Sequence, residues 1–412
     1  MRVSSIAALL SGASLAAATP LAHSERNDGY NGIGNAGYKG RVGPSTATCT
    51  QEYYEISVTS MNTVFENVLS NANETYLTYL LSQFVAQLPA TMGNFTEKYE
   101  APAKEAISGT YTISGTLCTP LDGDEDDGAI QLLVHGIGFD SSYWDFAATD
   151  EDYSYVSAAA QAGHTTFHYD RLGTGLSEKP EDAYNTVQAA TDVAILSEII
   201  SMLQNGKIGG KKYSKLAAVG KFSVQLNYIT QTLPKAFDTV VLTGFSANTT
   251  AVPLYQTSAA YSTASIVAPS RFPATQFTNA YLITLSAWTN QLNFAWFGHY
   301  SNDAINLARA TEQPVTQGVL FTFGALSGKA PMYKGNVHVV TGDRDWIFCE
   351  LNCIFGAPPG VASIPALVSE YYPSAASFST YIPAEVGHAI NIHQQAPQVY
   401  QEILSYLNTV FY

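Results

Sequence analysis

The chain has 412 residues, of which 12% are aromatic and only 13% are charged. This length and composition allow a large packed core and argue against a disordered protein. Its 34 acidic and 19 basic side chains give a formal net charge of −15, and the basic residues form no stripe. Nucleic acids and anionic membranes are therefore poor partner candidates, and the acidic surface mainly indicates solubility.

The N-terminus resembles a secretory signal. Arg2 supplies a positive charge, and residues 6–18 form an apolar stretch too short to span a bilayer. Small residues around positions 16–19 suit signal peptidase, with cleavage near Ala18 or Ala22 and a non-cleaved anchor as the alternative. We therefore predict a signal peptide over residues 1–19, and a secreted, extracellular, soluble protein.

A leader follows the signal. Residues 20–48 are rich in Gly, Asn and Ser and have little apolar periodicity, which is typical of a flexible segment. Three sequons fit a secreted protein and predict glycosylation at Asn73, Asn94 and Asn248.

Four cysteines form an even set, which in an oxidising compartment predicts two disulfides among Cys49, Cys118, Cys349 and Cys353. Three pairings exist. The short spacing between Cys349 and Cys353 favours a bridge there, with Cys49 and Cys118 forming the other. No second Cys/His pair has zinc-like spacing, so a metal site is not expected. The sequence also implies no organic cofactor.

The folded body alternates strands with helices. Residues 53–60 and 109–120 resemble strands, and 75–88 a helix, before a regular series of short apolar runs begins at residue 129. Helix-length segments such as 187–204 separate most of these runs, which end near residues 136, 173, 220, 246, 345 and 388. This rhythm predicts an α/β fold whose mostly parallel sheet carries helices on both faces.

One interval interrupts this alternation of strands and helices. Residues 248–330 contain aromatics and alanines at helical spacing and no convincing sheet strand. We predict an inserted helical lid there, between a first core part at 49–247 and a second at 331–412.

Acidic and histidine side chains follow the later strands. Asp343 and Asp345 come directly after one run, and His388 follows the last one. Ligands bind beyond the carboxyl ends of parallel strands, so these ends are where reactive side chains gather. An acid followed by a histidine suits a serine–acid–histidine triad, in which the imidazole takes the serine proton and the carboxylate orients the ring.

Four motifs carry a resemblance to the α/β-hydrolase superfamily, and within it to secreted fungal serine hydrolases of the esterase/lipase type. They are "LLVHGIG", "HYDRLGTGLS", "VVTGDRD" and "VGHA", spread over residues 109–407 apart from the lid. The resemblance implies Ile137 as an oxyanion donor, Asp345 as the acid and His388 as the base. Asp343 and His393 are the alternatives for acid and base, and Ser246 is expected to be a structural polar group.

The expected Gly-x-Ser-x-Gly at the nucleophile elbow is missing from "VGKFSVQ", residues 219–225. In one alignment Ser223 is the nucleophile of a degenerate elbow. In the other, Phe222 and Ser223 match residues that follow the serine, so the nucleophile and the second glycine are absent. The second alignment matches more residues of the family motif. It implies either lost hydrolase activity or a misspliced reading of an active gene.

The predicted activity is hydrolysis of small carboxylic esters by Ser223, Asp345 and His388, with the N–H groups of Ile137 and Val224 as the oxyanion hole. The lid aromatics Trp288, Phe294, Trp296 and Phe297 indicate a pocket for an apolar acyl or aryl substrate. The alternative is a binding protein on the same fold, without the nucleophile. The sequence defines no oligomeric state.

Overall fold

The computed structural model describes residues 43–68, 73–86, 95–123, 128–146 and 153–412. The predicted signal peptide lies outside these ranges, as do the Asn94 sequon and residues 20–42 of the predicted leader. The last leader residues, 47 and 48, already belong to the first strand.

An eight-stranded sheet forms the centre of the molecule, in the order β1-β2-β4-β3-β5-β6-β10-β11. The pairs β1/β2 and β2/β4 are antiparallel, and all other neighbours are parallel. The predicted mostly parallel sheet is thus present. Its strands are β1 (Ala47–Asn62), β2 (Glu105–Pro120), β3 (Ala129–Val134), β4 (Thr166–Tyr169), β5 (Lys215–Lys221), β6 (Thr239–Thr243), β10 (Asn336–Val340) and β11 (Ser377–Tyr381).

The inner strands are buried on both faces. Every residue of β3, β4 and β6 is buried, and in β5 only Lys215 is exposed. Strands covered on both sides need near-continuous apolar runs, which is why the sequence shows runs here and not alternation.

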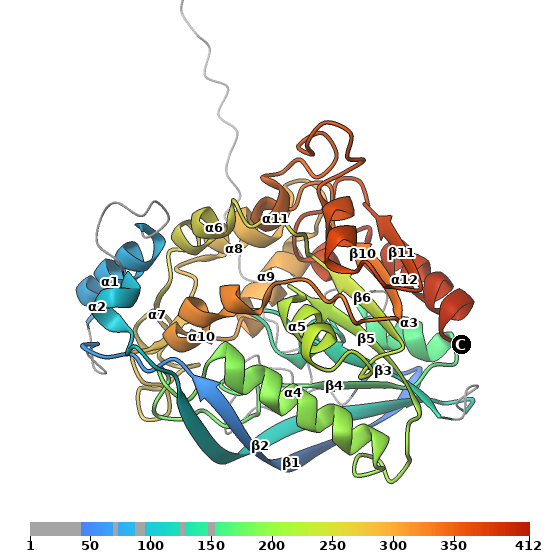
Figure 1. Ribbon diagram of the computed structural model, residues 1–412, viewed down its shortest axis with the longest axis horizontal. Coiled ribbons are helices and arrows are strands. Elements are labelled where there is room, and N and C mark those ends of the chain that lie inside the picture. The colour runs from blue at the N-terminus through green and yellow to red at the C-terminus, as the bar shows by residue number, and fades with distance from the viewer. Residues whose placement is uncertain (1–42, 69–72, 87–94, 124–127, 147–152) are drawn as a thin grey trace, which may run out of the picture.

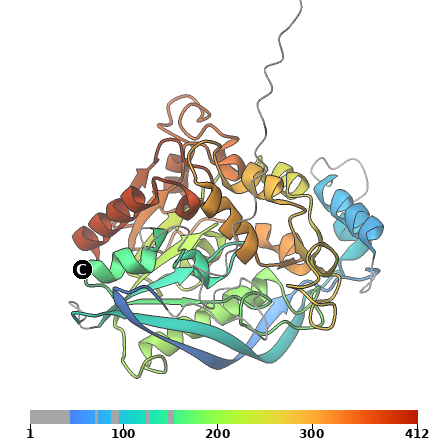
Figure 2. The same ribbon diagram turned by 180° about the vertical axis from the view of Figure 1, so that it is seen from behind.

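Helices cover both faces of the sheet (Figures 1 and 2). On one face α4 packs against β1 and α5, and α5 against β6; on the other α12 packs against α3 and β6. These helices are α3 (Tyr155–Gln161), α4 (Ala189–Gln204), α5 (Val224–Thr232) and α12 (Ala396–Val410). Short 3₁₀ helices at Ser141–Tyr143, Pro365–Tyr371 and Ile390–Ile392, and helix α11 (Trp346–Cys349), lie in the connections.

The interval 248–330 is mainly helical, but it also contains a three-stranded sheet of β7, β8 and β9 that the sequence did not predict. These strands have only two or three residues each, too few to produce a periodic signal. The elements are α6 (Val252–Ser258), β7 (Ser262–Thr263), α7 (Ala264–Val267), β8 (Tyr281–Ile283), α8 (Ala287–Phe294), α9 (Asn302–Thr311), β9 (Val315–Thr316), α10 (Gln317–Thr322) and η4 (Phe323–Leu326).

The N-terminal helices α1 (Glu74–Ala86) and α2 (Phe95–Tyr99) lie at the outer edge of this interval (Figure 1). Contacts of α1 with α6 and β7 join it to the inserted segment. The N-terminal part of the chain therefore packs against the inserted segment.

Both favoured disulfides are present. Cys49 and Cys118 face one another across β1 and β2 and are bonded. Cys349 and Cys353 are bonded at the end of α11. Among the helices of the described ranges, none has the length and apolar character that a membrane crossing needs.

Candidate active site

The predicted triad residues lie beyond the carboxyl ends of neighbouring parallel strands. The turn at residues 222–223 follows β5, Asp345 follows β10, and His388 follows β11. Only β6 separates β5 from β10 in the sheet, so the topology brings all three segments to one edge.

Asp345 and His388 form a buried pair. Oδ2 of Asp345 lies 2.8 Å from Nδ1 of His388, and both side chains are fully buried. The other oxygen, Oδ1, accepts the backbone N–H groups of Ile347 and Phe348 at 2.8 and 2.9 Å and so caps α11. One carboxylate therefore anchors itself to the helix and orients the imidazole.

The second ring nitrogen of His388 lacks a hydrogen-bond partner in the described part of the chain. Nε2 is buried and has no hydrogen-bond partner within the described ranges. Burial lowers the pKa of His388, against the opposing charge of Asp345. A neutral ring that donates Nδ1–H to Asp345 carries a lone pair on Nε2, so this atom can accept a proton.

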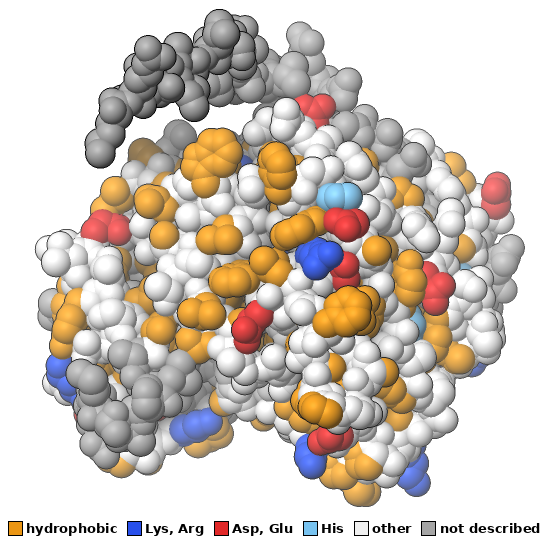
Figure 3. Space-filling model, turned by 90° about the horizontal axis from the view of Figure 1, so that it is seen from above, with side chains coloured by type: hydrophobic (Ala, Val, Ile, Leu, Met, Phe, Trp, Pro, Cys, Tyr) orange, Lys and Arg blue, Asp and Glu red, His pale blue; other side chains and the backbone are white. Residues whose placement is uncertain are grey.

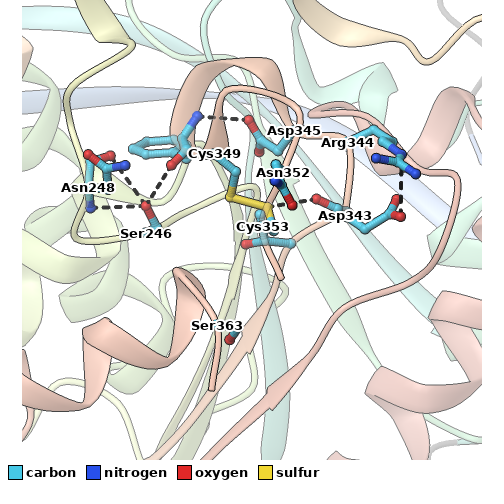
Figure 4. Close-up of a disulfide and its surroundings, with 12 residues drawn as sticks. Ser246, Asn248, Asp343, Arg344, Asp345, Cys349, Asn352, Cys353 and Ser363 are labelled. Atoms are coloured by element: carbon cyan, nitrogen blue, oxygen red, sulfur yellow. Dashed lines mark hydrogen bonds and ion pairs between the residues drawn. A yellow bond between two sulfur atoms is a disulfide. The ribbon is translucent and has the colours of Figure 1, made fainter. Parts of the chain in front are cut away.

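Asp343 faces Arg344 (Figure 4). Its Oδ2 lies 3.5 Å from Nε of Arg344, and its Oδ1 accepts the N–H of Val386 at 3.3 Å. Asp345 is thus the acid that contacts His388, on a loop that the Cys349–Cys353 bridge closes.

His393 is engaged by the backbone on both sides of its ring. Nε2 accepts the N–H groups of Trp296 and Gly387, each at 2.9 Å, and Nδ1 donates to the carbonyl of Ala389 at 2.8 Å. Burial lowers the pKa of His393 to about 4. This histidine holds the lid end against the His388 loop and has no nitrogen left for catalysis.

Ser246 plays the structural part expected of it. Its hydroxyl accepts the N–H of Asn248 at 3.0 Å and lies 3.2 Å from the carbonyl oxygen of Phe348, to which it donates (Figure 4). It ties the end of β6 to α11.

The apex of the strand-to-helix turn is Phe222. It lies between the end of β5 and Ser223, the N-cap of α5, and has a φ of +56°. Positive φ is rare for a bulky residue and marks the strained position that an elbow nucleophile occupies.

The turn therefore has a register that neither predicted alignment contained. Gly220 stands two residues before Phe222, and Val224 two after it. A Cβ on Gly220 would lie 2.6 Å from Cδ1 of Leu226, so the first glycine still lets α5 approach β5. In this register the turn reads Gly-x-Phe-x-Val, with no gap.

The Phe222 ring packs against the histidine. Its centroid lies 5.6 Å from that of His388 in an edge-to-face arrangement, and 5.3 Å from those of Phe323 and Phe348. An aromatic side chain thus stands beside the ring that would activate a serine.

Ser223 is not brought together with Asp345 and His388. Its side chain is buried, and Oγ donates to the carbonyl oxygens of Gly220 and Thr243 at 2.7 and 3.2 Å. It ties the turn between β5 and α5 to the end of β6 and makes no hydrogen bond to His388.

The two predicted oxyanion donors differ in their state. The N–H of Val224 donates to the carbonyl of Phe222 at 2.6 Å and is therefore occupied. With residue 222 at the apex, the donor after it is Ser223, because the family geometry uses the residue following the nucleophile. Neither the Ser223 nor the Ile137 N–H donates a hydrogen bond within the described residues.

Lys221 is a buried amine that sequence reasoning missed. Nζ lies 3.9 Å from the ring centroid of Phe139 and 4.5 Å from that of Phe294, without a hydrogen-bond partner in the described part of the chain. Burial lowers its pKa far below the usual value, although the charge of Asp345 opposes this. Only its place directly before the elbow could have drawn attention to it.

The four predicted pocket aromatics do not gather around one cavity. Phe294 is buried, with its ring centroid 6.1 Å from that of His388. Trp296 is half-buried and donates Nε1–H to Glu385, whereas Trp288 and Phe297 are 77% and 76% exposed. Figure 3 shows the apolar side chains that the molecule presents on one face.

Two sequons lie in described segments. Asn73 is exposed, and Asn248 is half-buried with Oδ1 accepting from Thr250. Glycosylation at these positions stays a prediction. Within the described ranges, no group of three or more His, Cys, Asp or Glu side chains is arranged to hold a metal ion.

The chain belongs to the alpha/beta hydrolase family, whose sequence model matches residues 131–402. No curated protein matches the chain.

Solved structures similar to it include a bromoperoxidase from Bacillus anthracis, at 16% identity and a TM-score of 0.48, covering 73% of this chain and 96% of that one. A monoacylglycerol lipase from Paleococcus ferrophilus has 14% identity and a TM-score of 0.45, with 71% and 96% covered. The peroxisomal alpha-beta-hydrolase Lpx1 of Saccharomyces cerevisiae has 10% identity and a TM-score of 0.49, with 89% and 90% covered.

Proposed function

We propose that this chain is a ligand-binding protein on the α/β-hydrolase scaffold and does not hydrolyse esters through a covalent serine intermediate. The observation that carries this proposal is Phe222 at the apex of the elbow, with a φ of +56°. A phenyl ring has no nucleophilic atom, and it stands beside the imidazole that would otherwise receive the serine proton.

The rest of the hydrolase arrangement argues for an intact scaffold. The Asp345–His388 pair is buried and hydrogen-bonded, and Gly220 still allows close packing of α5. The proposal therefore concerns the loss of one group within a folded site. It does not require a damaged core.

A second candidate is the predicted carboxylic-ester hydrolase with Ser223 as nucleophile. The unpartnered Nε2 of His388 favours it, since a base with a vacant lone pair is what a serine needs. This function requires the Ser223 hydroxyl to leave the carbonyls of Gly220 and Thr243 and the Phe222 ring to move aside.

We also propose that the protein is secreted and glycosylated. The apolar N-terminal segment and the three sequons support this, and the two disulfides are consistent with an oxidising compartment.

The test is treatment of the secreted protein with a fluorophosphonate probe, followed by intact-mass analysis. The proposal predicts no adduct on folded protein, and no difference between the wild type and Ser223→Ala. An adduct that maps to Ser223 and disappears in that variant would establish the hydrolase instead. Sequencing the transcript across residues 219–225 tests the misspliced alternative directly, because it would reveal a Gly-x-Ser-x-Gly.

A further inference from the structure

A cavity of about 340 Å³ lies beside the elbow, between α1, α6, α10, η4 and α11. Its volume is within the range of small-molecule sites, roughly 300–1,000 Å³. The wall is mainly apolar and aromatic, and includes Phe84, Val252, Leu320, Phe321, Phe323 and Phe348.

The lining selects for an uncharged ligand. None of the described residues that line the cavity carries a charged side chain. Among its polar members, Ser327 has a buried Oγ without a hydrogen-bond partner in the described ranges. An ionised ligand would lose its hydration here without a counter-charge, whereas a single hydroxyl or carbonyl oxygen would find a partner in Ser327.

The cavity is separated from His388 by aromatic rings. Phe323 and Phe348 line the cavity and also pack on Phe222, which in turn packs on His388. A molecule in the cavity is therefore held away from the imidazole, which suits binding without chemistry.

Part of the wall comes from outside the segment that the family model matches. Phe84 and Val85, at the end of α1, precede residue 131, where that match begins. The cavity wall thus combines residues that precede the family match with residues of the lid.

We propose that this cavity binds a neutral, mostly apolar molecule with one hydrogen-bonding oxygen, of the size of a ten-carbon alcohol. The inference rests on the proposed binding function and names its ligand class.

The experiment is calorimetric titration of the full-length protein with 1-decanol and, separately, with decanoate. The two probes share their chain and differ in charge. We expect saturable binding of 1-decanol and at least tenfold weaker binding of decanoate. Equal affinity for both probes, or no binding of 1-decanol, would overturn the proposal.

Two variants of one helix locate the site. Val252 is half-buried and lines the cavity, whereas Leu254 on the same helix is 50% exposed and does not. Val252→Trp should weaken 1-decanol binding at least tenfold, and Leu254→Trp should change it less than twofold. Equal effects of the two substitutions would place the bound alcohol elsewhere and refute the cavity.

A third variant covers the case in which Val252→Trp fails to fold. Ser327→Ala removes the hydroxyl but little volume, so it should weaken 1-decanol binding at least threefold and leave naphthalene binding unchanged. A parallel loss for both probes would contradict the role given to Ser327.

Failure of this inference and failure of the proposed function have different readouts. A fluorophosphonate adduct on Ser223 would overturn the proposed function even if 1-decanol binds. Absence of both an adduct and 1-decanol binding would overturn the cavity assignment alone.

Discussion

Phe222 meets His388 edge-to-face, with ring centroids 5.6 Å apart, at the apex of the turn between β5 and α5. The imidazole donates a 2.8 Å hydrogen bond to Asp345, and its Nε2 has no hydrogen-bond partner among the residues that the structure describes. The predicted acid and base are therefore paired beside an apolar apex.

Lys221→Met should stabilise the protein. The unfolded amine has a pKa near 10.4, and burial lowers this pKa well below that value in the fold, so folding disfavours the protonated amine. The wild type then loses about 1.4 kcal/mol for each pH unit below the unfolded pKa, until the folded pKa is reached. Thermal denaturation should show a higher Tm for Lys221→Met, with a larger gap at pH 7 than at pH 9. A lower Tm for the variant at both pH values would show that the buried amine of Lys221 does not destabilise the fold.

Three buried histidines should make the fold sensitive to acid. Burial lowers the pKa of His168, His338 and His393 to about 4, whereas an unfolded histidine titrates near 6.5. Between these values the unfolded chain binds protons that the fold excludes, so stability falls as pH drops through this window. Each histidine lowers the free energy of unfolding by on the order of 3 kcal/mol once the pH is below both of its pKa values.

His168→Phe checks this directly, because it removes one of the three titrations. Between pH 7.5 and 4.5, the Tm of the variant should fall less steeply with decreasing pH than the Tm of the wild type. Identical slopes would show that His168 is not held neutral in the fold.

The two disulfides should contribute unequally. Cys49 and Cys118 are 69 residues apart, whereas Cys349 and Cys353 are four apart. Loop-closure entropy predicts about 4 kcal/mol for the first bridge and about 2 kcal/mol for the second. Chemical denaturation measures the loss of free energy of unfolding in two double variants, each compared with the wild type. They are Cys49→Ser/Cys118→Ser and Cys349→Ser/Cys353→Ser. A larger loss from the short loop would contradict the entropic account.

Much of this arrangement is predictable from sequence, since it depends on periodicity and order. Apolar runs alternating with helical segments indicate the parallel sheet, whose strands need apolar side chains on both faces. The contact between Asp345 and His388 follows because both residues come after neighbouring parallel strands.

The elbow register is harder to predict. A phenylalanine at positive φ costs strain, so patterns for this turn assign the apex to a serine flanked by glycines. Only the backbone shows that Phe222 takes this conformation and that Gly220 is correctly spaced from it. The amine of Lys221 has no sequence signal of burial, and β7, β8 and β9 are too short to recognise.

The most direct test of the apolar apex is to restore the missing hydroxyl. Phe222→Ser places a hydroxyl at the strained position beside the His388 ring, and Phe222→Ala removes the phenyl ring without adding an oxygen. The lost packing costs roughly 3–5 kcal/mol in either variant, so melting curves must first show that both are folded.

The decisive measurement is fluorophosphonate labelling of the wild type and these two variants, followed by peptide mapping. We predict an adduct at position 222 in Phe222→Ser alone, and its loss when His388→Ala is added. A wild-type protein labelled at Ser223 as fully as Phe222→Ser is labelled at position 222 would contradict the account.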